Sequence, residues 1–341
     1  MSIGTIRWGF VGTGSIASWM ASAIKDADNS ELAAVSSRVT RSAQAFADAN
    51  QVGRAFDSWA DMIAWDGVDA IYVATPTSTR EAICIDAAKN GKHVLCEKPF
   101  ASLASLQRII TACREQGVGF MDGTHFSHHP RTHDIRSRMP GSVGWPCSLD
   151  SSFQFNLEDR GNIRFDPELE PLGAIGDAGW YNMRAIVEYL PPDAGLVSAS
   201  TYLRRDDGTG AVIHGGGVML FDDGSLSTWS CGFDSGGVSM DLRIAGANGV
   251  IRLDDFISHD DSARGTYTLQ KGDFSTGPKV ESITIAANKP GPSLMYEAFA
   301  LMVTDKAEIE HNMRLSEHTQ RLLDAAWKSG LENEQGQDDS K

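Results

Sequence analysis

A glycine-rich turn close to the N-terminus constrains the fold of this chain more than any other feature. The β-rich run Ile6–Val11 leads into the GxGxxA sequence of residues 12–17, and a helical pattern begins there and continues to residue 27. Its glycines permit a tight turn and a close approach of the main chain to a pyrophosphate, while the helix N-terminus supplies amides. A glycine turn that binds nothing is the alternative, and the flanking strand and helix argue against it. The residues expected at the phosphates are Gly12, Thr13, Gly14, Ser15 and Ile16.

The rest of the first 123 residues alternates between short apolar runs and helical patterns. The run at 70–74, AIYVA, is apolar throughout, as in a strand covered on both faces. Strands that alternate with helices imply parallel pairing and right-handed crossovers. Residues 1–123 are therefore predicted to form a doubly wound α/β domain. Its further strands are expected at 32–36, 93–96 and 118–121, and its further helices near 41–49, 79–90 and 103–116.

The chain from about residue 145 has a different pattern. Turn sequences such as Asp222-Asp223-Gly224 and Asn248-Gly249 separate strand-like segments and indicate antiparallel hairpins. We therefore predict a second domain over 124–330 with an open, mainly antiparallel sheet, followed by a polar tail at 331–341. Its strands are expected at 148–155, 196–204, 212–221, 225–233, 239–245 and 250–253, and its helices at 177–189, 293–303 and 315–329.

Composition excludes several classes of partner. The 30 basic and 45 acidic residues give a formal charge of −15, which argues against nucleic acid and against an anionic membrane surface. No stretch approaches the roughly 20 apolar residues of a membrane span. The five cysteines are scattered, and the N-terminus lacks the pattern of a signal peptide. These features predict a cytosolic protein with reduced thiols.

The end of the second predicted strand indicates which dinucleotide binds. An NAD-specific domain carries Asp or Glu there, on the ribose 2′-hydroxyl. This chain has Ser37 and Arg38 instead, and Arg41 follows. A hydroxyl with guanidinium groups suits a 2′-phosphate, because arginine recognises phosphate through charge-assisted hydrogen bonds. We therefore expect NADP(H) to be preferred, with NAD(H) possible; a solvated surface position for Arg38 is the alternative.

Glu97-Lys98-Pro99 follows the predicted strand at 93–96. Ligands of doubly wound sheets bind at the carboxyl ends of the strands, so Lys98 is expected in the cofactor crevice. Pro99 restricts Lys98 to extended conformations, which defines its position more closely than that of most loop lysines. A lysine there can transfer a proton. A surface Lys–Glu pair is the alternative interpretation.

Three motifs together carry a resemblance to a known family. The GTGSIA turn, Ala74-Thr75-Pro76-Thr77 and Glu97-Lys98-Pro99 resemble the glucose-fructose oxidoreductase, inositol dehydrogenase and rhizopine-catabolism (Gfo/Idh/MocA) family. The resemblance implies a Rossmann domain joined to an open-sheet domain, and hydride transfer between NAD(P) and a sugar or polyol. It also implies that Lys98 acts at the reacting oxygen. Further cofactor contacts are expected at Thr75, Pro76, Glu97 and Lys98.

The predicted helix at 177–189 carries a polar row beside an apolar stripe. Asp177 and Tyr181 are four residues apart and share a face, which Arg184 extends. A solvated outer face is the alternative. The resemblance implies that Asp177 and Tyr181 lie at the substrate, as in the glucose-fructose oxidoreductase, dihydrodiol dehydrogenase and xylose dehydrogenase branch. Proton transfer then rests on Lys98 and Tyr181, with Asp177 orienting, and which of the two is the formal acid or base stays open.

Four histidines lie between residues 125 and 133, and they raise the question of a metal. A catalytic zinc requires three protein ligands and an open position, and no cysteine is nearby. We therefore expect no metal and interpret the segment as a polar wall of the substrate pocket. The substrate contacts predicted from these segments are His125, Arg164 and Arg184.

Two other functions remain open at this point. A redox-neutral sugar-modifying enzyme would hold its cofactor tightly, and a dinucleotide-binding sensor would not need Lys98 or Tyr181. The second-half sheet includes a glycine-rich strand around 214–218 and apolar residues on both faces. A partner is expected to cover its outer face, which predicts a homodimer or homotetramer through this sheet.

Overall fold

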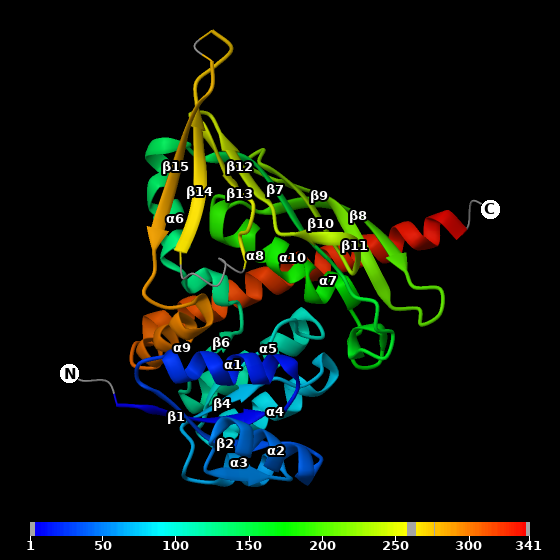
Figure 1. Ribbon diagram of the computed structural model, residues 1–341. Helices are drawn as coiled ribbons and strands as arrows, with labels where there is room; N and C mark the ends of the chain where they lie inside the picture. The colour runs from blue at the N-terminus through cyan, green and yellow to red at the C-terminus, as the bar shows by residue number, and fades with distance from the viewer. Residues whose placement is uncertain (1–3, 258–263, 276, 339–341) are drawn as a thin grey trace. The chain divides into compact units, whose positions relative to one another are not determined.

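The computed structural model describes residues 4–257, 264–275 and 277–338 (Figure 1). These residues divide into two compact units. Unit 1 comprises the described residues of Met1–His128 together with Lys289–Glu317. Unit 2 comprises the described residues of His129–Asn288 and His318–Lys341. Each unit therefore consists of two separate stretches of the chain.

Unit 1 is a parallel sheet with helices on both of its faces, as the apolar runs predicted. Its six described strands pair in the order β3-β2-β1-β4-β5-β6, and every neighbouring pair is parallel. The strands are β1 Ile6–Val11, β2 Ser30–Ser36, β3 Arg54–Phe56, β4 Ala70–Val73, β5 His93–Cys96 and β6 Phe120–Asp122. The helices are α1 Ser15–Asp26, α2 Thr40–Asn50, α3 Trp59–Ala64, α4 Thr77–Lys89, α5 Leu103–Gln116, the 3-10 helix η1 His125–His128 and α9 Gly291–Met302.

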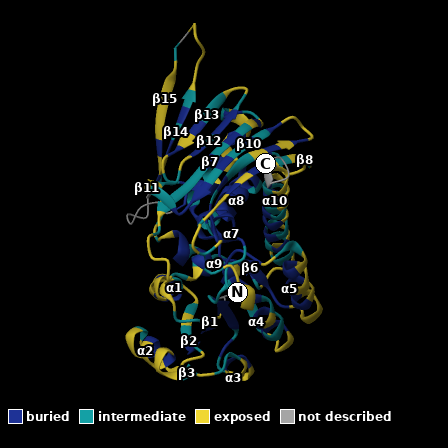
Figure 2. Cartoon of the chain, turned by 90° about the vertical axis from the view of Figure 1, so that its right-hand side faces the viewer, coloured by how far each residue is buried: buried dark blue, intermediate teal, exposed yellow. Residues whose placement is uncertain are grey.

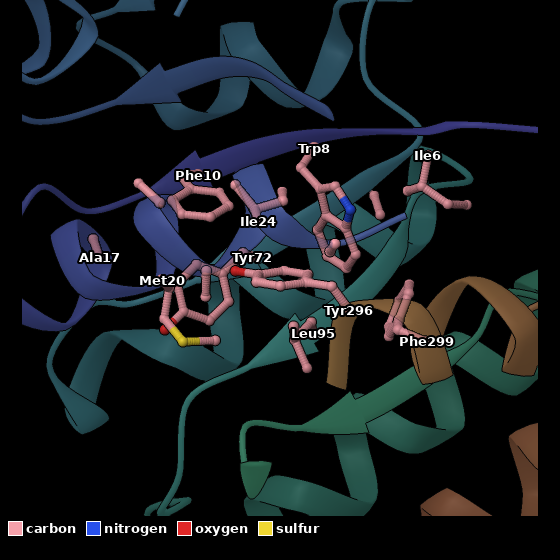
Figure 3. Close-up of a cluster of buried hydrophobic side chains, with 14 of the residues drawn as sticks. Ile6, Trp8, Phe10, Ala17, Met20, Ile24, Tyr72, Leu95, Tyr296 and Phe299 are labelled. Carbon is pink, nitrogen blue, oxygen red and sulfur yellow. The ribbon is translucent and has the colours of Figure 1, made fainter. Parts of the chain in front are cut away.

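Aromatic side chains join α9 to the β1 side of this sheet (Figure 3). The ring of Trp8 lies 5.0 Å from that of Tyr296 and 4.7 Å from that of Phe299, and all three side chains are buried. The hydroxyl of Ser293 donates to the carbonyl oxygen of Ala23 in α1 at 2.9 Å. Residues 289–317 therefore complete the core of unit 1, although they follow the second domain in the sequence.

Unit 2 is built on a sheet of nine described strands. Eight follow the order β15-β14-β13-β12-β7-β10-β9-β8, and β11 pairs with β7. Most pairs are antiparallel, while β7 and β10 pair in parallel. The strands are β7 Pro146–Asn156, β8 Leu196–Arg205, β9 Val212–Phe221, β10 Leu226–Gly232, β11 Asp234–Ser239, β12 Leu242–Gly246, β13 Gly249–Leu253, β14 Arg264–Lys271 and β15 Lys279–Ala286. The helices are α6 Pro130–Ser142, the 3-10 helix η2 Ile163–Phe165, α7 Gly173–Asp177, α8 Gly179–Tyr189 and the later part of α10 Lys306–Asp338.

The fold class predicted from the sequence is confirmed: a Rossmann-type domain is followed by a mainly antiparallel sheet.

The division of the chain differs from the predicted one, because 289–317 pack with unit 1 rather than with the second domain. The described part of the expected tail, through Asp338, continues helix α10, and Arg205 of β8 anchors it by donating from Nε to the carboxylate of Glu334 at 2.9 Å. The predicted helix at 177–189 is interrupted at Ala178, which separates α7 from α8.

Within the described ranges, no helix has both the length and the apolar character that a bilayer crossing requires.

Candidate functional site

The carboxyl edge of the unit 1 sheet brings together the segments that the sequence predicted to bind a cofactor. Strands β2 and β3 extend from one side of β1, while β4, β5 and β6 extend from the other. The direction of winding therefore changes between β1 and β4, and ligands of such sheets bind outside the strand ends at this change. The turns after β1, β2, β4 and β5 all open at that edge.

The turn after β1 has the geometry of a phosphate-binding loop. Gly12 has a φ of +115°, and a Cβ there would lie 2.7 Å from the carbonyl oxygen of Ala74, so the position requires glycine. Gly14 caps helix α1 without a side-chain hydrogen bond, and a Cβ at Gly14 would meet no atom within 4 Å. The side-chain position of Gly14 thus faces open space at the start of α1, with Ser15 and Ile16 in the helix and Thr13 in the turn.

A buried hydroxyl nearby also suits a ligand. Thr75 follows β4, and its Oγ1 is buried without a hydrogen-bond partner among the described residues. Buried polar groups in proteins are normally satisfied, so this atom is suited to a donor or acceptor on a bound group. Pro76, the next residue, precedes helix α4. The open turn at Gly14 and the unsatisfied Thr75 hydroxyl together fit a dinucleotide.

The segment after β2 carries positive charge. Arg38 and Arg41 are exposed, and neither forms an ion pair within the described part of the chain. The hydroxyl of Ser37 accepts a hydrogen bond from the amide of Val39 at 3.4 Å. Helix α2 begins at Thr40 with no acidic residue in its first turn. This edge of the sheet therefore presents two guanidinium groups and a hydroxyl, as the sequence predicted.

Glu97 and Lys98 lie buried at the end of β5. The hydroxyl of Tyr72 donates to Glu97 Oε1 at 2.7 Å, and a Cβ at Gly123 would lie 2.8 Å from the same oxygen. Burial and the carboxylate of Glu97 raise the pKa of Tyr72 well above its usual value, so this phenol stays protonated as a donor. Glu97 is thereby fixed between the strand ends, next to a lysine whose peptide bond to Pro99 is cis.

A second polar cluster lies within unit 2. Arg164 of η2 holds the carboxylate of Asp177 through Nε at 2.6 Å and Nη2 at 3.3 Å. The carboxylate raises the pKa of Arg164, so the guanidinium stays protonated. Tyr181 lies one turn beyond Asp177, and the edge of its ring meets Phe153 at 5.4 Å. The predicted residues Arg164, Asp177 and Tyr181 thus belong to one cluster, which a bidentate ion pair orders.

Comparison with known proteins identifies the family. Residues 6–124 match the model of the Gfo/Idh/MocA oxidoreductase family with an NAD-binding Rossmann fold. The chain is 31% identical over 233 residues to D-xylose 1-dehydrogenase (NADP(+)) 2 of Haloferax volcanii, covering 67% of this chain and 70% of that protein. It is 28% identical to a dTDP-3,4-didehydro-2,6-dideoxy-alpha-D-glucose 3-reductase of Streptomyces antibioticus, covering 70% and 72%.

The chain belongs to the Gfo/Idh/MocA family.

The fold of this family member extends over both units. A 3-ketoreductase from Actinomadura kijaniata, crystallised with NADP and TDP-benzene, superposes with a TM-score of 0.85 at 23% identity. The match covers 96% of this chain and 98% of that one. The resemblance drawn from the three sequence motifs is therefore confirmed, as is the prediction of a nicotinamide dinucleotide as cofactor.

The histidine segment is divided between the units of this Gfo/Idh/MocA protein. In unit 1, His125 is buried and its ring meets Trp19 edge-on at 5.2 Å. In unit 2, His129 caps α6, accepting the amide of Arg131 at 3.0 Å. Among the described residues, no group of three or more His, Cys, Asp or Glu side chains has the geometry of a metal site. The substrate contact assigned to His125 stays a prediction.

Arg184 occupies a buried position in unit 2. Its Nη1 lies 3.9 Å from Glu188 Oε1, and its guanidinium lies 5.9 Å from the ring of Trp180. Arg136 approaches the other Glu188 oxygen at 3.2 Å. The spacing of four between Arg184 and Glu188 was visible in the sequence, and it indicates this intrahelical pair as readily as a substrate contact. The substrate contact of Arg184 stays a prediction.

Substitution of Gly14 separates cofactor binding from folding. Gly14→Ala adds a methyl group that meets no protein atom, so the free energy of unfolding should fall by no more than about 1 kcal/mol. Affinity for NADPH should nevertheless fall at least about tenfold, because the methyl group occupies the space of the pyrophosphate. Urea unfolding and NADPH fluorescence titration measure the two effects. Gly53→Ala, at another exposed glycine with open space, is the matched control, and equal affinities of the two variants would contradict the assignment.

Proposed function

We propose that this protein is an NADP(H)-preferring oxidoreductase that transfers a hydride between the nicotinamide and a hydroxyl or carbonyl carbon of a sugar or polyol. The observation that carries the proposal is the shared edge of the unit 1 sheet, where buried Lys98 follows β5 and the open Gly14 turn follows β1. The names of the relatives support the substrate class: a xylose dehydrogenase, a deoxyhexose 3-reductase and a scyllo-inositol 2-dehydrogenase.

The preference for NADP(H) rests on the segment after β2. Ser37, Arg38 and Arg41 offer donors to a 2′-phosphate, and no carboxylate lies between residues 36 and 41 to receive a 2′-hydroxyl. Two of the relatives carry NADP(+) in their names, which agrees with this choice. NAD(H) would bind the same turn after β1 without the contribution of these side chains.

Removing one guanidinium tests the cofactor preference. Arg38→Ala should raise the KM for NADP about 10- to 100-fold, since a hydrogen bond to a charged group contributes about 1.5–3 kcal/mol. The KM for NAD should change less than about twofold, because NAD lacks the 2′-phosphate. Steady-state kinetics with both cofactors on one preparation provide an internal control. A similar rise for both cofactors would refute the role of Arg38.

The proposed chemistry assigns proton transfer to side chains of the protein. A bound nicotinamide supplies or accepts the hydride. Lys98 and Tyr181 donate hydrogen bonds, or a proton, to the oxygen that becomes alkoxide-like during carbonyl reduction. Asp177 has an orienting role, and Arg164 holds the Asp177 carboxylate in one orientation through two hydrogen bonds. Substrate hydroxyl groups are proposed to contact His125, Arg164 and Arg184.

A substrate panel with two variants tests this chemistry. Absorbance at 340 nm with NADP(H) should change with at least one aldose, inositol, deoxy-ketosugar or dihydrodiol. With that substrate, Lys98→Met and Tyr181→Phe should each lower kcat about 10²- to 10³-fold while NADPH still binds. If Lys98 and Tyr181 act on the same oxygen, the fold-loss in kcat of the double variant should be much smaller than the product of the two single fold-losses.

Lys89→Met, at an exposed lysine of α4, is the control and should retain full activity. Retained turnover in Lys98→Met would remove Lys98 from the mechanism. Turnover without net absorbance change would instead identify a redox-neutral reaction.

We propose that the partners are a small sugar or polyol and further copies of the chain, in the cytosol, rather than nucleic acid or membrane. The acidic net charge of −15 and the scattered cysteines support this choice.

One face of the unit 2 sheet is suited to self-association. Helix α8 covers the opposite face, where Asn182 donates to Ser151 Oγ at 2.8 Å. The strands of this sheet include intermediate and exposed residues (Figure 2). On the uncovered face, strand register aligns one row across neighbouring strands. Arg243 donates to Asp150 at 2.7 Å within this row, beside a hollow of about 450 Å³. The row consists of Ser200, Val218, Thr228, Asp150, Arg243 and Arg252.

Light scattering tests the assembly. We expect a mass of two or four times 36.8 kDa at micromolar concentration, and Val218→Arg should shift the mass toward one chain. NADPH binding per chain should stay unchanged, since Val218 belongs to unit 2 and is 41% exposed. A single-chain mass for the unsubstituted protein would contradict the proposal.

A further inference from the structure

Arg80 is a buried cation on helix α4 that binds two main-chain carbonyl groups. Its side chain is 7% exposed. Nε donates to the carbonyl oxygen of Thr75 at 2.8 Å, and Nη1 donates to that of Pro99 at 2.6 Å. Thr75 follows β4 and Pro99 follows β5, so one guanidinium connects two segments that are 24 residues apart in the sequence.

The neighbouring carboxylate on α4 has a different partner. Glu81 receives two hydrogen bonds from Arg108 of α5, at 2.5 and 2.8 Å, at the surface of unit 1. Burying a charged group is costly unless hydrogen bonds compensate it. The guanidinium is also planar, and its fixed fork holds two acceptors at a defined separation. Arg80 is thus suited to setting the distance between the two carbonyl groups.

The segments that Arg80 connects begin where the strand ladder stops. Strands β4 and β5 pair up to Val73 and Cys96, and the amide of Glu97 then donates to the carbonyl oxygen of Val73 at 2.9 Å. Beyond this bond, the Arg80 side chain bridges the two segments through Thr75 and Pro99.

Lys98 therefore stands between two anchored neighbours. On one side, the carboxylate of Glu97 accepts the buried hydroxyl of Tyr72 at 2.7 Å. On the other side, the carbonyl group of Pro99 is held by Arg80. The residues on both sides of Lys98 are thus held by buried groups of unit 1.

We propose that Arg80 is a positioning residue for catalysis: it sets Lys98 against the Thr75 segment and so aligns the lysine with the reacting oxygen. This inference rests on the proposed function of Lys98. A misplacement of about 1 Å can cost about 100-fold in rate, so loss of the fork acts on the chemical step more than on binding.

The central experiment compares Arg80→Met with Arg108→Met. Arg80→Met should lower kcat about 10- to 100-fold per NADPH-binding site, with less than about threefold change in substrate KM. The kinetic isotope effect with 4-deuterated NADPH should rise, because chemistry becomes more rate-limiting. Arg108→Met removes an equally long side chain from a surface pair and should leave all three quantities unchanged. The proposal would be overturned if Arg80→Met had the same kcat and the same isotope effect as the unsubstituted protein.

Two further variants separate positioning from general structural support. Arg80→Lys keeps the charge but loses the planar fork of donors. Its kcat should lie between that of the unsubstituted protein and that of Arg80→Met. Arg80→Ala should regain activity when free guanidinium chloride is added at low millimolar concentration. If Arg80→Met fails to fold, these two variants carry the test. Absence of both the intermediate rate and the rescue would overturn the proposal.

Combining Arg80→Met with Lys98→Met separates a failure of the positioning role of Arg80 from a failure of the proposed role of Lys98. If Arg80 acts through Lys98, adding Arg80→Met to Lys98→Met should lower the residual kcat no further. A further 10-fold loss of kcat would show that Arg80 supports the site independently of Lys98. That result would overturn the positioning role of Arg80 but not the proposed role of Lys98. If Lys98→Met itself retains full activity, the proposed function fails, whatever the behaviour of Arg80.

Discussion

Parallel pairing of β1, β4 and β5 is the constraint on which the candidate cofactor site depends. Neighbouring parallel strands end at the same edge, so the turns after Val11, Val73 and Cys96 open side by side although more than 80 residues separate the first from the last. The change of winding direction between β1 and β4 leaves a crevice there. The buried, apolar character of these strands thus places the Gly14 turn, Thr75 and Lys98 at one edge.

Buried polar groups behind that edge give the segments one conformation. A low-dielectric interior strengthens a hydrogen bond and makes an unsatisfied polar group costly. The Tyr72–Glu97 bond and the two bonds of Arg80 are of this kind, and all involve segments next to Lys98. The same reasoning applies in unit 2, where the bidentate Arg164–Asp177 pair fixes a carboxylate near Tyr181. In both units, ionic and polar groups order the side chains to which we assign chemistry.

Local sequence signals predicted most of the fold of unit 1 and the hairpins of unit 2. They were less informative where an element derives its stability from distant residues. The short strand β3 and helix α3 are examples, as is the β14–β15 hairpin, whose Tyr267 is anchored to Asp134 of α6 at 2.6 Å. The sequence also suggested a row of polar residues on one helix, whereas Arg184 is buried beside Glu188. Burial of a charged residue depends on its tertiary partners, which lie outside any local window.

The glycine turn, with the strand before it and the helix after it, by itself predicted a Rossmann-type domain and a dinucleotide cofactor, because it acts through backbone geometry within a few residues. Tertiary structure alone decided two other features. Helix α9 returns from the far end of the chain to place Tyr296 and Phe299 against Trp8. Arg80 binds the carbonyl groups of Thr75 and Pro99. Every residue has a main-chain carbonyl group, so such acceptors leave no mark in a sequence, and only the folded chain shows which of them a buried guanidinium reaches.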